Sequence, residues 1–154
     1  MPFTIASINQ GNEAGVTNVS ITVPAAPIFN ETKLIPGESV GPEDLEVTNN
    51  GDENVLYYIF ADWKPAIGTT PAGAQILADR LNILIEDDQV TPTVLYNGPI
   101  SGLIEQPSAG RELAAQASET LKITVSLPDD VGNIVQNLAI EVDLIFVAQL
   151  EEEP

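Results

Sequence analysis

The sequence predicts an all-β protein, a β-sandwich with one or two short helices. The strongest indication comes from residues 118–127 and 139–149, in which apolar and polar side chains alternate with a period of two, as in half-buried strands. Shorter runs of strand-forming residues recur at a spacing of roughly 8–12 residues, with turn residues between them. The two long strands carry no recognisable catalytic residues, which favours a structural role.

The N-terminal part divides into an apolar segment, a hinge and a first strand of the sandwich. Residues 2–10 are short, apolar and uncharged, and residues 11–15 (GNEAG) form a polar hinge flanked by glycines. Residues 18–23 alternate as a half-buried strand. Pro24 ends this strand, because proline has no N–H to donate to a neighbouring strand.

The next elements alternate between turns and strands. A Pro-Gly turn within residues 34–41 precedes a strand that starts at 45–48. Residues 49–52 (NNGD) predict a tight turn, because Asn and Gly accept positive φ. Residues 55–63 are apolar on both faces, so we expect a strand in the centre of its sheet.

The middle of the chain holds the one convincing helical stretch. Residues 71–81 place apolar side chains at helical spacing and begin with a proline, which suits a helix start. A strand at 81–85 follows, and residues 94–96 and 97–99 predict a short strand and a turn. Edge pieces or loops are expected at residues 101–105 and 113–117.

Length and charge limit the classes of partner. The 154 residues fit one domain, and an apolar content of 44% is sufficient for a core. Five basic residues against 23 acidic ones give a net charge of −18, which repels nucleic-acid phosphates and anionic membranes. We therefore expect no nucleic-acid partner and no membrane insertion. The charge predicts a solvated, repulsive surface, or alternatively one that awaits calcium or basic neighbours.

The residue types that are absent exclude several chemistries. Without cysteine there are no disulfides or thiolate metal sites, and without histidine there is no His-based zinc site and no Ser-His-Asp triad. No apolar run approaches the roughly 20 residues that span a bilayer. The first ten residues lack a basic region and a long apolar core, so we expect that a leader has been removed or that export does not use one.

Seven runs of residues, in their order and spacing, resemble the TasA/camelysin family of secreted bacterial biofilm-matrix fibre proteins. Together they cover most of the chain between residues 17 and 149. The runs are residues 36–39 (PGES), 45–50 (LEVTNN), 57–63 (YYIFADW), 77–85 (LADRLNILI), 95–102 (LYNGPISG), 118–128 (SETLKITVSLP) and 132–149.

The resemblance implies a jelly-roll-like or Ig-like sandwich that polymerises into extracellular fibres, in which an N-terminal strand of one subunit fills a groove in its neighbour. The family is also classified with zinc peptidases. This chain departs from it, because it has no histidine and therefore no H-E-x-x-H pair to hold zinc.

The apolar N-terminal segment is the candidate donor strand. Its subunit-contacting residues would be Phe3, Ile5, Ala6 and Ile8, and its hinge glycines Gly11 and Gly15. A sheet edge offers unpaired N–H and C=O groups that an added strand satisfies, and burying the three large side chains contributes on the order of 5 kcal/mol before entropy. Alternatively the segment pairs within its own subunit or stays frayed. The chain thus divides into donor strand and hinge (1–15), sandwich (16–150) and acidic tail (151–154).

The other candidate sites have less support in the sequence than the donor strand. The acidic turns at 52–53, 86–88 and 129–130 could supply calcium ligands, but none has EF-hand spacing, so we expect solvated turns and no metal or cofactor. Trp63, beside Lys64 near its strand end, is the one aromatic worth checking as a sugar platform. A Lys–Asn isopeptide bond would suit such a sandwich, but nothing in the sequence selects a pair.

These observations predict a non-enzymatic structural subunit of an extracellular fibre, in a biofilm matrix or on a cell or spore surface. Its partner would be a second copy of the chain, joined head-to-tail, with other matrix or surface proteins as further partners. The alternative is a monomeric extracellular adhesion or ligand-binding module that recognises its partner through loops 64–75 or 97–110. A third, weaker hypothesis is a hydrolase that uses two of the carboxylates.

Overall fold

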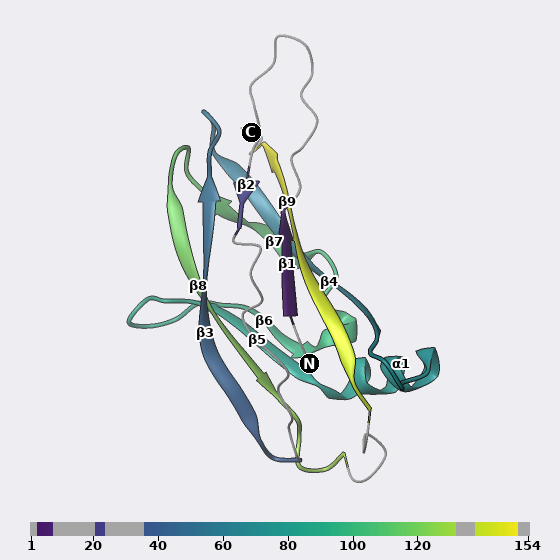
Figure 1. The fold of residues 1–154 in the computed structure, drawn as a ribbon. Coiled ribbons are helices and arrows are strands. Elements are labelled where there is room, and N and C mark those ends of the chain that lie inside the picture. Colours follow the sequence, from purple (N-terminus) through teal and green to yellow (C-terminus); the bar gives the residue numbers. More distant parts are fainter. Residues whose placement is uncertain (1–2, 8–20, 24–35, 132–137, 151–154) are drawn as a thin grey trace.

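The computed structural model describes residues 3–7, 21–23, 36–131 and 138–150, which form a sandwich of two β-sheets with one short α-helix (Figure 1). The four-stranded sheet has the order β1 (Phe3–Ser7), β9 (Ile140–Leu150), β4 (Val55–Pro65), β7 (Gln106–Leu113). The five-stranded sheet has the order β2 (Ile21–Thr22), β3 (Ser39–Asn49), β8 (Ser118–Ser126), β5 (Asn82–Asp87), β6 (Val94–Pro99). The predicted all-β sandwich is confirmed.

The two long alternating strands, β8 and β9, supply much of the core. Their predicted inward-facing residues are buried, including Ile123 in β8 and Leu144 in β9, each 0% exposed. The two strands lie in different sheets, so the chain between them crosses from one layer of the sandwich to the other. Period-two alternation therefore identifies the buried face of each strand correctly, while the choice of sheet depends on contacts distant in sequence.

β4 lies inside the four-stranded sheet, as its apolar sequence predicts. All eleven of its residues pair with β9 in one unbroken antiparallel register, from Val55 opposite Leu150 to Pro65 opposite Ile140. Tyr57 is fully buried, and the centroid of its ring lies 5.9 Å from the ring centroid of Phe146 on β9. This pair of strands is the most regular part of the sheet.

The helix α1 (Pro71–Arg80) matches the predicted helix and lies at one end of the sandwich (Figure 1). The Thr70 side chain caps it by accepting a hydrogen bond from the Gly73 N–H at 3.0 Å, and Pro71 occupies the first turn, where no backbone donor is needed. The helix buries Leu77 and Ala78 against the core. The chain then enters β5 directly.

Three local predictions were wrong or incomplete. Residues 97–99 form the last part of β6 instead of a turn, and the chain reverses in the 3₁₀ helix η1 (Ile100–Gly102). The bend after β3 does not use positive φ, because the Asn49 side chain makes it by accepting the Gly51 N–H at 2.9 Å. The edge strand β7 was not predicted, since Pro107 and Gly110 interrupt its pattern.

Candidate subunit interface

β1 forms an edge of the four-stranded sheet by pairing in parallel with β9, as the purple and yellow arrows of Figure 1 show. The register runs from Phe3 opposite Val142 to Ser7 opposite Phe146. β9 is eleven residues long, so among the described residues its positions 140–141 and 147–150 have no strand partner on the β1 side. A short strand thus covers part of a longer, regular one.

The predicted donor residues fall partly within this strand. Phe3, Ile5 and Ala6 lie in β1, whereas Ile8, Gly11 and Gly15 lie outside the described residues. β1 pairs with β9 of its own chain, which is the arrangement expected as the alternative to donation. A strand from a second copy would use the same β9 backbone groups, so donation to a neighbour stays a prediction.

The β9 residues opposite β1 alternate between the core and the outer face of the sheet. Val142, Leu144 and Phe146 are each 0% exposed with β1 in place. Asp143 and Ile145, between them, are half-buried on the other face. Because the core fixes the inner face of β9, the register of β9 in its sheet is defined. The backbone N–H and C=O groups on its β1 side are therefore held at fixed positions.

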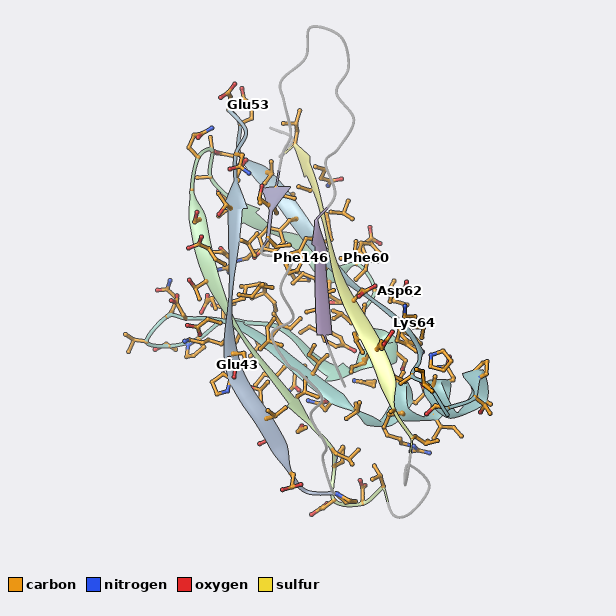
Figure 2. The ribbon with its side chains drawn as sticks, in the orientation of Figure 1. Glu43, Glu53, Phe60, Asp62, Lys64 and Phe146 are labelled. Atoms are coloured by element: carbon orange, nitrogen blue, oxygen red, sulfur yellow. The ribbon has the colours of Figure 1, made fainter. Side chains whose placement is uncertain are left out.

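The outer face of β4 and β9 is polar at the end nearest α1 (Figure 2). Lys64 pairs with Glu141 opposite it, with Nζ and Oε2 3.2 Å apart, while Asp62 lies opposite Asp143. Lys64 is therefore engaged in a surface ion pair. Trp63, the candidate sugar platform, is half-buried and packs against the core, which fits a structural role.

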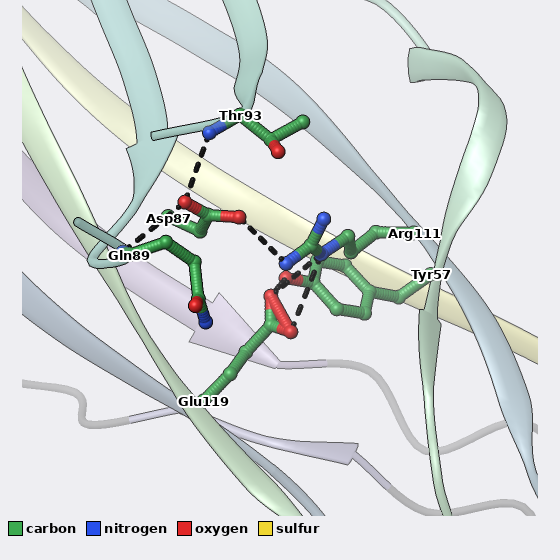
Figure 3. Close-up of polar contacts among 6 residues, drawn as sticks. All are labelled: Tyr57, Asp87, Gln89, Thr93, Arg111 and Glu119. Carbon is green, nitrogen blue, oxygen red and sulfur yellow. Dashed lines mark hydrogen bonds and ion pairs between the residues drawn. The ribbon is translucent and has the colours of Figure 1, made fainter. Parts of the chain in front are cut away.

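A polar network of Tyr57, Asp87, Arg111 and Glu119 joins the two sheets on the side away from β1 (Figure 3). Arg111 on β7 donates from Nε to the Glu119 carboxylate of β8 at 3.0 Å, and from a terminal nitrogen to Asp87 of β5 at 3.1 Å. The Tyr57 hydroxyl on β4 donates to Glu119 at 2.7 Å. We call these four residues the inter-sheet network.

Asp87 also organises the turn between β5 and β6. It is 4% exposed, and its carboxylate accepts the backbone N–H groups of Thr93 at 2.9 Å and Gln89 at 3.3 Å. Burial raises the pKa of Asp87, but these two donors and the Arg111 guanidinium outweigh burial and lower the pKa below its ordinary value. The carboxylate is therefore held ionised, and it accepts hydrogen bonds from Gln89, Thr93 and Arg111.

The other members of the network respond to the same charges. Burial raises the pKa of the Tyr57 hydroxyl, and the neighbouring Glu119 carboxylate raises it further, so Tyr57 stays protonated and acts as a donor. Burial lowers the pKa of Arg111, but the hydrogen bond to Glu119 and the charges of Glu119, Tyr57 and Asp87 together outweigh burial and leave the pKa raised. No buried side-chain polar atom of the described residues lacks a partner, so the network is suited to holding the sheets together.

Sequence reasoning did not find this network and assigned Asp87 only to an acidic turn. The structure brings together side chains that are 8 to 62 positions apart, such as Arg111 with Glu119 and Tyr57 with Glu119. One signal was present: Arg111 is one of only two arginines in a strongly acidic chain.

Within the described residues no three acidic, histidine or cysteine side chains are placed to hold a metal ion.

Asn49 makes a second polar connection between the sheets. It is 0% exposed, and its amide donates to the Leu113 and Ala114 carbonyl oxygens at the end of β7, each at 3.1 Å. It also donates to the Glu53 carbonyl at 2.9 Å. β3 in one sheet and β7 in the other are therefore fastened together by hydrogen bonds at this end of the sandwich.

Among the helices described, none has the length and apolar character needed to traverse a bilayer. Comparison of the chain with protein-family models finds no match, and comparison with curated proteins finds none either.

Proposed function

We propose that the protein is a non-enzymatic structural subunit of an extracellular fibre, in a biofilm matrix or on a cell or spore surface. Subunits would join head-to-tail, with residues 2–10 of one copy added as a strand to the sandwich of the next. The observation that supports this proposal best is β1 itself, a five-residue N-terminal strand on the edge of an eleven-residue strand. The resemblance to the TasA/camelysin family supports it independently.

Strand exchange between copies would reuse contacts that the chain already makes. Exchange between copies replaces each β1–β9 contact with the same contact from a neighbour, so it needs no new complementary surface. A head-to-tail contact that does not close into a ring produces a filament. With no cysteine in the chain, β-pairing and subunit contacts would supply the fibre's strength.

Electron microscopy of the purified protein, with and without residues 2–10, tests the proposal. We expect fibres from the intact chain and folded monomers from the shortened one. A variant with Phe3→Asp, Ile5→Asp and Ile8→Asp keeps the length of the segment and should also lose fibres, because an edge strand with three charges cannot be buried. Fibres that form unchanged from both variants would exclude these residues as the donor.

A second function, a monomeric binding module, is favoured by one observation. Two large apolar side chains are exposed in the loops expected to carry recognition, Ile67 at 106% and Ile104 at 59%. Exposed apolar residues on loops are typical of contact sites for a partner. Sedimentation of concentrated protein separates the two functions, because a binding module remains monomeric at concentrations where a fibre subunit assembles.

A further inference from the structure

We infer that the edge of β9 is the surface that accepts the donor strand, in parallel orientation with Phe3 opposite Val142, and that the occupant is residues 3–7 of a second copy. This inference rests on the proposed fibre function and names its accepting edge. It follows from a comparison of the strand edges that the structure describes. The two sheets have four edges that could accept a donor: the edge of β9, which β1 covers, the edge of β7, the edge of β3, which β2 partly covers, and the edge of β6.

The β9 edge has the geometry that an added strand requires. β9 contains neither proline nor glycine, and its pairing with β4 runs over eleven residues without a register shift. Every backbone group facing outward is therefore evenly spaced for a new ladder. β1 already pairs with five β9 residues in the parallel sense, which shows that this edge and this segment are compatible.

The β3 edge is poorly suited to accept an apolar strand. Pro42 has no N–H, and the register with β8 shifts between Val40 and Glu43. Gly41 has a φ of +104°, and a side chain there would come within 2.6 Å of the Ile123 carbonyl oxygen. The strand also carries three acidic residues, Glu43, Asp44 and Glu46. Charge, proline and a bulge are the features that protect a sheet edge from pairing.

The β7 edge is irregular in a similar way. Pro107 interrupts its donors, Gly110 has a φ of +80°, and its register with β4 shifts between Tyr57 and Ile59. Arg111 of this strand is held by the inter-sheet network. A strand fixed in this bent form cannot straighten to pair with a donor without breaking those ion pairs.

The β6 edge is short and ends in residues that do not support a ladder. It has six residues, of which Gly98 and Pro99 are the last two, and its register with β5 shifts between Ile85 and Glu86. Of the edges described, β9 alone combines length, regular spacing and an apolar inner face. One accepting edge and one donor per copy give an unbranched polymer with a direction, in which β1 must first leave β9 of its own chain.

Cross-linking of mixed full-length variants tests the inference, because the chain contains no cysteine of its own. One copy carries Thr4→Cys, whose register partner is Asp143, and the other carries Asp143→Cys. Matched acceptors place the cysteine at exposed positions on the other three edges: Glu46→Cys on β3, Ser108→Cys on β7 and Asn97→Cys on β6. Disulfide-linked dimers are quantified after mild oxidation under assembly conditions.

We expect the Asp143→Cys copy to give about tenfold more linked dimer than the three controls, because only Cα atoms about 4.4–6.8 Å apart are bridged without strain. Preferential linkage to one of the other edges, while fibres still form, would overturn the inference and leave the fibre function standing. If the mixture forms no fibres, a peptide of residues 2–10 with Thr4→Cys is added to the full-length Asp143→Cys chain. Its capture would support the β9 edge although the fibre function fails, and lack of capture would overturn both.

Discussion

The two sides of the four-stranded sheet are held by different means. On the β7 side, Arg111 joins Asp87 and Glu119 of the opposite sheet, and Asn49 adds hydrogen bonds to the end of β7. On the β1 side, backbone pairing over five residues holds the edge strand to β9. From this difference we expect that β1 can leave β9 while the β7 side keeps the two sheets together.

The largest effect on stability should follow removal of the Arg111 charge from the inter-sheet network. Arg111→Met leaves two carboxylates, Asp87 and Glu119, without their counter-ion, and we expect a loss of about 3 kcal/mol in the free energy of unfolding. Urea denaturation measures this loss. Lys64→Met is the matched control, since it removes a surface pair and should cost less than about 1 kcal/mol. Equal losses would show that the network does not hold the two sheets.

The next effect concerns Asp87 and has a defined pH dependence. Because the pKa of Asp87 is lowered in the folded state, its stabilising contribution is full above the unfolded-state pKa of about 3.9 and is lost as the pH falls through the folded-state pKa. We expect Asp87→Asn to cost about 2 kcal/mol at pH 7 and to flatten the decline of stability at acidic pH. Urea midpoints between pH 2 and 7 test this, and parallel curves for the two proteins would contradict it.

A smaller effect is expected from the neutral member of the network. Tyr57→Phe keeps the buried ring against Phe146 but removes the hydroxyl that donates to Glu119. Since Arg111 still binds that carboxylate, we expect a loss of about 1 kcal/mol, measured by the same denaturation. Tyr58→Phe, on the outer face of the same strand, is the control and should change stability less.

The smallest effect on stability should come from deleting the N-terminal segment that contains β1. Deletion of residues 2–10 removes five strand pairs, but ordering each residue costs about 1–2 kcal/mol, which offsets most of the gain from pairing. We therefore expect less than about 1 kcal/mol of change in unfolding free energy. A loss as large as that of Arg111→Met would show that β1 is part of the cooperative core and that the two sides are equally fastened.

Sequence patterns determined the local structure well where one strand or helix could be judged by itself. Ile123, Leu144 and the capped helix at Pro71 all follow from period and turn chemistry that neighbours in the chain supply. The β7 strand escaped prediction because Pro107 and Gly110 are typical of turns, and only pairing with β4 keeps the segment extended. Local preference was overridden there by contacts distant in sequence.

The polar network could not be predicted for the same reason. Arg111 meets Asp87 and Glu119 only after β5, β7 and β8 have been placed in two facing sheets. A rare arginine marks the position as unusual without naming its partners. The N-terminal segment was recognised from its apolar residues, but its parallel orientation and its β9 partner are visible only in the assembled sheet.

The parallel orientation of β1 has a practical consequence for labelling the molecule. Because both strands run the same way, Phe3 lies beside Val142, near the start of β9, and Leu150 lies at its far end. At about 3.3 Å per residue, these eight steps separate the two positions by roughly 26 Å. A fluorophore attached at Leu150 would therefore distinguish the two ends of β1, because it lies far from Phe3 but only four steps, or roughly 13 Å, from Phe146, the residue opposite Ser7.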